Sequence, residues 1–476
     1  MWAVISIFSR NIMSREIATL SLLELSDAFA TSELSPVDAT RAALDQIAAH
    51  NDTVNAIAYL AEQEAMTHAK EAEQRWQKGH QFSPFDGVPC TVKDSVFVEG
   101  WPTRYGSQLE DPNNLAPEDA PVTARLREAG MVVIAKTTMP EYGWKGTTDN
   151  KIQGITPNPW DLEKSAGGSS GGGAVATALG MGAFAIGTDG GGSIRIPASF
   201  CGLFGLKPTS SVVASYPPSG FGTLAHTGPI TRSVTDAALV MNIIAQPDHR
   251  DFNELPCVNK DYFEHVDTAL GASKIAFSPA LGKYAVESEV ADLVAKAVEA
   301  FADIGAELSK TDPDVEGFHD AFDIHWQVAC RANYADLPED KKALMDPGLV
   351  ALSEHARHVD LVSYFQAEQT RREITVKLNR FFTEYDLLVT PTLPVTAFPA
   401  AQDSPSPNSD GTIDSWTPFT CLFNFTGHPA ATVPCGFTTS GLPVGLQIIS
   451  GHYRDDLVLR AARVIENMYP IVLPTL

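Results

Sequence analysis

Two glycine clusters, each holding serine, stand close together in residues 165–195 and are the first candidates for chemistry. The first cluster reads Gly167-Gly-Ser-Ser-Gly-Gly-Gly173, and the second reads Gly187-Thr-Asp-Gly-Gly-Gly-Ser-Ile-Arg195. Glycine adopts backbone angles closed to other residues and lets a substrate approach the main chain. The apolar residues between the clusters predict a buried helix that leads into a buried strand, which would hold both loops rigidly. We therefore interpret the clusters as a reacting centre rather than as two flexible turns.

Several kinds of site can be compared with these residues. The stretch from Gly167 to Gly171 fits the G-x-S-x-G nucleophile elbow, with His226 or His428 as its base. That elbow needs a buried strand before its serine, and residues 162–166 do not predict one. Neither G-x-x-x-x-G-K nor G-x-G-x-x-G occurs here, which disfavours a nucleotide loop. The paired histidines at positions 355 and 358 lack a third ligand at suitable spacing, so we expect no metal site and no cofactor.

What remains is a serine activated by a lysine that is distant in sequence. Lys93 ends a short apolar run, and burial in such a setting lowers the pKa of a lysine until the neutral amine can act as a base. Together with the glycine clusters, this lysine forms a pattern that resembles the amidase signature family. Five blocks carry the resemblance in order: Gly87-Val-Pro-Cys-Thr-Val-Lys-Asp94, Gly167-Gly-Ser-Ser-Gly-Gly172, Gly187-Thr-Asp-Gly-Gly-Gly-Ser-Ile-Arg-Ile-Pro-Ala198, Cys201-Gly-Leu-Phe-Gly-Leu-Lys-Pro208 and Gly441-Leu-Pro-Val-Gly-Leu-Gln447.

The resemblance implies a triad in which Ser193 is the nucleophile, Ser169 is the bridging serine and Lys93 is the base. It also implies a cis peptide bond between Gly168 and Ser169. These roles make chemical sense, because a serine hydroxyl is a weak nucleophile that needs an adjacent base. Ser169 would relay the proton from Ser193 to Lys93 and later return it to the departing amine.

The negative oxygen of a tetrahedral intermediate needs preorganised hydrogen-bond donors, and we expect them from the main-chain N–H groups of Gly190, Gly191 and Gly192. Ser193 should open a short helix whose positive end favours the same charge. Ser170, Asp189 and Arg195 are expected to support this loop. Relatives often carry a larger residue at the position of Gly190 and serine at that of Gly173, so a roomier acyl pocket is expected here.

The substrate pocket is expected to draw on side chains before the first cluster, in a flap at residues 215–222, and near the C-terminal tail. The candidates are Tyr142, Trp144, Thr147, Tyr216, Phe221, Cys421 and Phe425. Each of them could equally belong to the core.

The elements that must position these residues predict an α/β fold, with a single large α/β/α domain whose central mixed, twisted sheet is covered by helices on both faces. Residues 1–80 predict a helical segment packed on the core, with capping signals at Ser21 and Ser35 and a third helix from 61 to Gly79. The resemblance assigns residues 81–476 to the amidase signature core, in one compact unit with the N-terminal segment. Its strands are expected at 88–93, 132–136, 203–206, 274–277, 386–390, 429–435 and 442–449, with helical periodicity at 286–308, a solvent loop at 402–414 and a closing helix at 455–468.

The length and the net charge of the chain limit the functions that are possible. The 476 residues can bury a large core, and the formal charge of -24 repels nucleic acid and anionic membrane surfaces. Six scattered cysteines predict reduced thiols and a cytoplasmic protein. The apolar run at residues 1–8 lacks the features of a signal peptide or a membrane span, and residues 1–12 need not belong to the native protein, since Met13 offers another start. A monomer or a homodimer is expected.

Three functions compete on these observations. The first is an amidase that hydrolyses a small carboxamide through an acyl-enzyme and that also accepts aryl amides, esters and carbamates (urethanes). The second, on the same fold, is an amidotransferase subunit that releases ammonia for amidation linked to transfer RNA. The third is a binding protein with a dead site, which the intact Lys93, Ser169 and Ser193 disfavour.

Overall fold

The computed structural model of the chain describes residues 14–256, 260–405 and 416–476. The expectations for the N-terminal apolar run, and for most of the loop at 402–414, fall on residues that lie outside the described ones. Within the described part, no helix combines the length and the apolar character needed to cross a bilayer.

A mixed sheet of eleven strands, in the order β1-β3-β2-β8-β10-β9-β14-β15-β13-β11-β12, organises the described residues. β2 pairs in parallel with β3 and β8, β11 pairs in parallel with β12 and β13, and the other neighbours are antiparallel. The strands are β1 (Ile57–Leu60), β2 (Pro89–Lys93), β3 (Val132–Thr137), β8 (Phe184–Asp189), β9 (Phe204–Lys207), β10 (His226–Thr231), β11 (Lys274–Phe277), β12 (Glu307–Lys310), β13 (Leu387–Pro391), β14 (Ala430–Phe437) and β15 (Pro443–Ser450). Two small hairpins stand apart, β4 (Asp149–Asn150) with β5 (Gly154–Ile155) and β6 (Pro157–Asn158) with β7 (Asp161–Ser165).

Helices cover both faces of this sheet, which confirms the predicted fold class. One hydrophobic cluster unites the sheet with α2 (Leu22–Thr31), α5 (Pro121–Glu128), α8 (Val234–Ile244), α9 (Ser288–Asp303) and α15 (Asp455–Met468). A second cluster unites it with α3 (Pro36–Val54), α4 (Glu62–Lys78), α6 (Gly171–Ala178) and α7 (Arg195–Cys201). A third cluster is built on α10 (Phe318–Tyr334), α12 (Pro347–His355), α13 (Leu361–Glu384) and α14 (Pro418–Thr426). The remaining short helices are α1 (Ser14–Ala18), α11 (Glu339–Lys342) and the 3-10 turns at Glu141–Gly143, Gly222–Leu224 and Ala356–His358.

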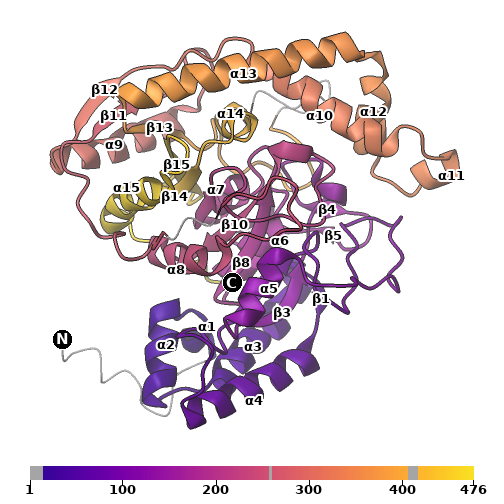
Figure 1. The fold of residues 1–476 in the computed structure, drawn as a ribbon, viewed down its shortest axis with the longest axis vertical. Coiled ribbons are helices and arrows are strands. Elements are labelled where there is room, and N and C mark those ends of the chain that lie inside the picture. The colour runs from indigo at the N-terminus through magenta and orange to yellow at the C-terminus, as the bar shows by residue number, and fades with distance from the viewer. Residues whose placement is uncertain (1–13, 257–259, 406–415) are drawn as a thin grey trace.

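Figure 1 shows how these groups are placed around the sheet. The helices α1 to α4 lie at one end of the molecule, and α13 lies across the opposite end. Ser21 forms the capping box predicted for α2, Ser35 caps α3 as predicted and does so in a second capping box, and Gly79 ends α4 in the left-handed conformation. The α2 side chains share the first hydrophobic cluster with β2.

Two central strands of the sheet, β2 and β8, bring polar side chains to the same edge of the sheet. Val92 and Ile186 face the first cluster, whereas Ala185, the neighbour of Ile186, faces the second. Val92 of β2 pairs with Ile186 of β8, and the two strands are parallel. Their carboxyl ends, Lys93 and Asp189, therefore meet at the same edge of the sheet.

The helical periodicity predicted for residues 286–308 extends too far. The helix α9 ends at Asp303, and residues Glu307–Lys310 form β12 beside β11. Gly305 lies between them with a φ of 87°, a backbone conformation that stops a helix without steric cost.

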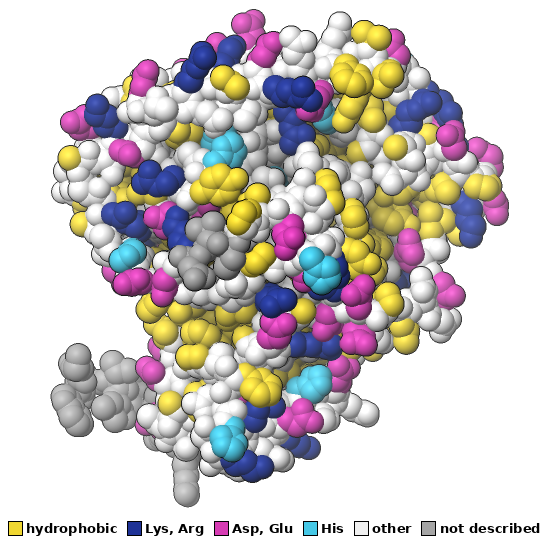
Figure 2. Space-filling view, viewed as in Figure 1, with side chains coloured by type: hydrophobic (Ala, Val, Ile, Leu, Met, Phe, Trp, Pro, Cys, Tyr) yellow, Lys and Arg dark blue, Asp and Glu magenta, His cyan; other side chains and the backbone are white. Residues whose placement is uncertain are grey.

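The molecular surface carries both signs of charge. On the face drawn in Figure 2, acidic and basic side chains are scattered among one another, without a continuous basic stripe. The chain as a whole has 58 acidic against 34 basic side chains. Such a surface offers little attraction to a polyanion on this face.

Candidate active site

Lys93 ends the buried strand β2, and its side chain is only 1% exposed. Its Nζ lies 2.7 Å from Ser169 Oγ and 2.9 Å from Thr188 Oγ1, and the longer contact to the Thr188 carbonyl is 3.4 Å. No carboxylate forms an ion pair with this amine among the described residues. Burial lowers the pKa of Lys93 to about 7, against the opposing pull of the Asp189 charge. The amine is therefore able to be uncharged, and so to act as a base, close to neutral pH.

Ser169 lies in the turn between β7 and α6, and its side chain is buried. The Gly168–Ser169 peptide bond is cis, as the resemblance implied. Close packing explains the glycine at position 168, because a Cβ there would collide with the Thr147 backbone. Ser170 ties the turn to β8, with its Oγ donating to the Thr188 carbonyl at 3.1 Å and accepting from the Thr188 N–H at 3.3 Å.

Ser193 follows β8 in the second glycine loop and is 6% exposed. Its carbonyl accepts a hydrogen bond of 3.1 Å from the Ser170 N–H, which joins the two glycine loops directly. Ser169 and Ser193 line the same cavity, whose volume is about 370 Å³. The helix α7 begins only at Arg195, so Ser193 precedes it instead of opening it as we expected.

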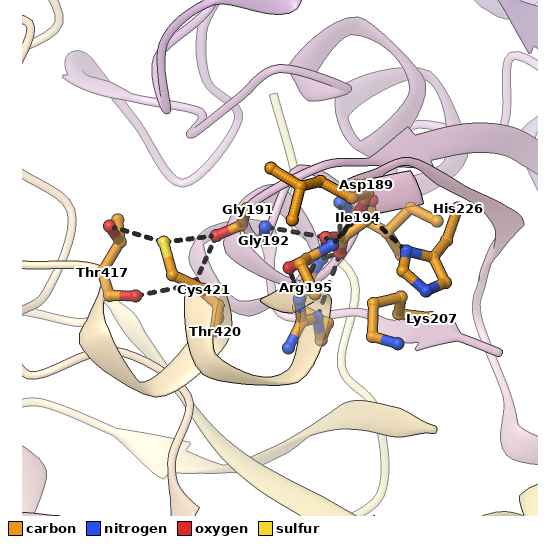
Figure 3. Close-up of polar contacts among 12 residues, drawn as sticks. Asp189, Gly191, Gly192, Ile194, Arg195, Lys207, His226, Thr417, Thr420 and Cys421 are labelled. Carbon is orange, nitrogen blue, oxygen red and sulfur yellow. Dashed lines mark hydrogen bonds and ion pairs between the residues drawn. The ribbon is translucent and has the colours of Figure 1, made fainter. Parts of the chain in front are cut away.

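Asp189 and Arg195, both buried, fix the second glycine loop through hydrogen bonds (Figure 3). The Asp189 carboxylate accepts hydrogen bonds from the N–H groups of Gly192, at 2.7 Å, and Ile194, at 3.0 Å. The Arg195 guanidinium donates two more to it, at 2.9 and 3.0 Å. Burial opposes the charge of Asp189, yet this guanidinium and these hydrogen bonds hold the pKa of the carboxyl below its usual range. An ionised Asp189 therefore holds the loop from within.

These hydrogen bonds bear on the expected oxyanion donors. The Gly192 N–H, which we expected to face the oxyanion, already donates to Asp189. Gly190 and Gly191 both lie against aromatic side chains, since a Cβ at Gly190 would be 3.3 Å from the Trp326 ring and one at Gly191 3.3 Å from the Phe322 ring. The space that a larger residue would fill at position 190 is thus occupied by an indole. The donor roles of Gly190 and Gly191 stay predictions.

The helix α14 holds the loop from its other side (Figure 3). Thr420 Oγ1 donates to the Gly191 carbonyl at 2.8 Å, and Cys421 Sγ contacts the same oxygen at 3.2 Å. Cys421 also lies 3.3 Å from the Thr417 hydroxyl. Cys421 is therefore a contact of the glycine loop, and burial raises the pKa of its thiol to about 12, so it remains a thiol.

The structure divides the expected pocket residues into two groups. Tyr142, Tyr216 and Phe221 line the cavity that holds Ser169 and Ser193. The other four candidates lie outside this lining: Cys421 contacts the glycine loop, Phe425 is fully buried in the third hydrophobic cluster, Trp144 packs against Gly348, and Thr147 packs against Gly168.

Several lining residues were not among our pocket candidates, although His226 was a candidate base for the nucleophile elbow. They are aromatic or polar side chains from three segments: Tyr105, Glu110, His226, Trp326, Asn333 and Tyr334. Trp326 stacks on Phe221 with ring centroids 4.0 Å apart, so α10 and the flap meet over the glycine loop. Trp326 and Tyr334 belong to α10, a helix that we did not predict, and only the helical spacing of its apolar residues could have indicated that face.

Two serines that line one cavity, one of them in contact with a buried lysine, form the kind of site that serine-dependent hydrolases use. The family model described as Amidase matches residues 38–459. The chain is 36% identical to an acylamidase of Rhodococcus erythropolis, over 95% of this chain and 96% of the relative. It is 32% identical to a glutamyl-tRNA(Gln) amidotransferase subunit from a Cyanothece species, over 94% of this chain and 98% of the relative. A solved bacterial aryl acylamidase of the amidase signature family superposes with a TM-score of 0.88 at 30% identity, covering 96% of this chain and 97% of that one.

The chain therefore belongs to the amidase family, and it is a hydrolase of carbon–nitrogen bonds in linear amides. Within the described residues, no group of three or more His, Cys, Asp or Glu side chains is arranged to hold a metal ion.

Proposed function

We propose that the enzyme hydrolyses amides through an acyl-enzyme on Ser193, with Ser169 as the bridging serine and Lys93 as the base. Neutral Lys93 accepts the Ser169 proton while Ser169 Oγ accepts the proton of Ser193, whose oxygen attacks the substrate carbonyl. Collapse of the tetrahedral intermediate breaks the C–N bond, and the same proton returns to the leaving amine. Water then repeats the sequence on the acyl ester. The 2.7 Å contact between the buried Lys93 Nζ and Ser169 Oγ carries this proposal.

The negative oxygen of each intermediate would be stabilised by the main-chain N–H groups of Gly190 and Gly191. Asp189, Arg195 and Ser170 support this role by fixing both glycine loops before the substrate arrives. Removal of one donor of this kind typically costs roughly 3–4 kcal/mol of transition-state stabilisation.

The preferred substrate is an amide with an aromatic group. The cavity walls support this, since they include five aromatic rings in addition to Tyr216: Tyr105, Tyr142, Phe221, Trp326 and Tyr334. The similarity to an acylamidase and to an aryl acylamidase supports the same choice. Esters and carbamates, including urethanes, also pass through a tetrahedral oxyanion, so we include them as alternative substrates.

An amidotransferase subunit is the second candidate, supported by the similarity to such subunits. A glutaminase must hold the carboxylate of free glutamine, and a lysine or arginine is the usual partner for that group. Neither residue type lines this cavity. The lining therefore favours a free-standing amidase.

A substrate panel tests the choice between these functions. We expect kcat/KM for an acetanilide to exceed that for glutamine by at least about 100-fold, because only the anilide fills the aromatic cavity. Esters and carbamates of the same aryl group should be hydrolysed as well. Steady hydrolysis of glutamine in preference to the anilides, or ammonia release that requires a co-purifying partner protein, would contradict the proposal.

We further propose that the enzyme acts in the cytoplasm as a monomer or homodimer, with residues 14–80, the described part of the expected segment 1–80, in one compact unit with the rest. The five described cysteines support a reducing compartment, since each is buried and free. Light scattering of the purified chain reports its mass directly, and a stable larger assembly would contradict this proposal.

Thr420 offers a test of the loop geometry. Thr420→Val keeps the shape of the side chain but removes the donor to the Gly191 carbonyl, so we expect kcat to fall about tenfold with KM unchanged. Thr420→Ser should restore most of the activity. Thr426→Val is the matched control. It removes another buried hydroxyl of α14, which donates to the Leu422 carbonyl within the same helix. An equal loss of kcat in both valine variants would show that the effect is only structural.

A further inference from the structure

The cavity lining contains an arrangement of side chains that the hydrolytic steps do not use. Tyr105, Tyr142 and Tyr334 form a row of stacked rings, with centroids 5.8 Å apart for the first pair and 4.9 Å for the second. The middle ring donates its hydroxyl to Glu110 at 2.8 Å. All four side chains line the cavity.

The tyrosine row lies close to the bridging serine, because the residue after Tyr142 packs against that serine. Gly143, which follows Tyr142, is so close to the bridging serine that a Cβ there would be 3.1 Å from Ser169 Oγ. A substrate whose carbonyl reaches Ser193 therefore has the tyrosine row within the same cavity.

Glu110 differs electrostatically from every other side chain in the lining. It is the one Asp or Glu among the residues around the cavity, and neither lysine nor arginine lines it. His226 also lines the cavity, but burial lowers its pKa far below the usual value, so its ring stays neutral. Among the described residues, no ion pair is formed by Glu110, which leaves this carboxylate without a positive partner. The chain's net charge of -24 adds a long-range attraction for cations.

We propose that Glu110 and the tyrosine row form a subsite for a positively charged group of the substrate, an ammonium carried by the aryl part of the amide. This inference rests on the amidase function proposed above. The carboxylate supplies a charge-assisted hydrogen bond, and the ring faces that are not covered by a neighbouring tyrosine supply a cation–π contact. A substrate with a carboxylate at the same place meets a like charge and no basic group. The subsite thus selects cationic aryl amides over anionic ones.

Three acetanilides that differ only in the para substituent test this subsite. The substituents are aminomethyl, which is cationic, hydroxymethyl, which is neutral, and carboxylate. We expect kcat/KM to be about tenfold higher for the cationic anilide than for the neutral one, and lower again for the anionic anilide. The preference should shrink as the salt concentration rises, because ions screen the attraction.

Variants assign the preference to Glu110. Glu110→Gln should lower kcat/KM about tenfold for the aminomethyl anilide and change the hydroxymethyl anilide by less than about threefold. Tyr142→Phe removes only the hydroxyl that bonds Glu110, so it should keep the order of the three substrates. Glu299→Gln on α9 is the matched control for net charge, since this exposed residue does not line the cavity.

The outcomes separate this inference from the proposed function. If the neutral anilide is hydrolysed but all three substrates react equally, the subsite is wrong and the amidase proposal stands. A preference that survives Glu110→Gln also overturns the subsite. If none of the anilides is hydrolysed, the proposed aryl amidase function itself fails.

Discussion

Replacing Lys93 with methionine is expected to lower kcat/KM by roughly 10⁴-fold or more while the protein stays folded. The amine is the one base that contacts Ser169, at 2.7 Å, in the described structure. Methionine has a similar length and an apolar side chain, so it fills the same buried space without accepting a proton. Steady-state hydrolysis of an anilide measures the loss.

We expect the Lys93→Met variant to be more stable than the wild type although it is less active. Lys93 has a pKa of about 7 in the folded protein and an ordinary value of 10.5, so between these values the unfolded chain binds more protons and wild-type stability rises with pH. Below pH 7 the full cost of burying the charge is present. The Tm advantage of Lys93→Met should therefore be largest below pH 7 and shrink toward pH 10.5.

The matched control is Lys136→Met, a second fully buried lysine on the neighbouring strand β3. Lys136 forms an ion pair of 3.4 Å with Asp94, so its loss leaves a buried carboxylate unpaired and should lower Tm. The folded fraction of this variant should still hydrolyse the anilide. If both variants lose activity and stability to the same extent, the effect of Lys93→Met comes from the loss of a buried side chain and not from the loss of a base.

Ser193→Ala is expected to abolish the covalent intermediate, whereas Ser169→Ala should slow its formation by roughly 10³-fold without preventing it. The first change removes the attacking oxygen, and the second removes only the path of the proton to Lys93. Mass spectrometry of enzyme trapped with an activated ester shows whether an acyl group is attached and to which peptide. Ser199→Ala, a buried serine on α7 that does not line the cavity, should react like the wild type.

The nucleophile elbow makes the contrary prediction for these variants. It places the acyl group on Ser169, so Ser169→Ala would abolish acylation and Lys93→Ala would retain it. The structure gives that alternative little support before the serine, because β7 has just one buried residue, and among the described residues it pairs with β6 in a small hairpin and with residue Pro399 in a single bridge at Lys164. An acyl group found on Ser169 would nevertheless decide in its favour.

The residues around the two serines could be predicted because their chemistry is local. Glycine positions such as 168 and 171 have no room for a side chain, and the strand before Lys93 is short, buried and apolar except for Thr91. The helix caps at Ser21 and Ser35 were equally visible, since each hydrogen bond joins residues three apart.

The rest depends on contacts between distant parts of the chain. Thr420 and Trp326 approach the glycine loop only because α14 and α10 pack against it. The spacing of residues in the sequence does not indicate this packing. The 24-residue helix α13 was missed because it is mostly exposed, with buried side chains only at Ala367, Ile374 and Leu378. The use of the Gly192 N–H by Asp189 is likewise a matter of loop geometry.

The pH dependence of kcat/KM tests most directly whether an uncharged Lys93 is the base. Because burial lowers its pKa to about 7, the rate should fall tenfold per pH unit below about 7 and reach a plateau above it. The residual rate of Lys93→Met should lack this inflection. A flat wild-type profile between pH 5 and 9, or the same inflection in both proteins, would contradict the account.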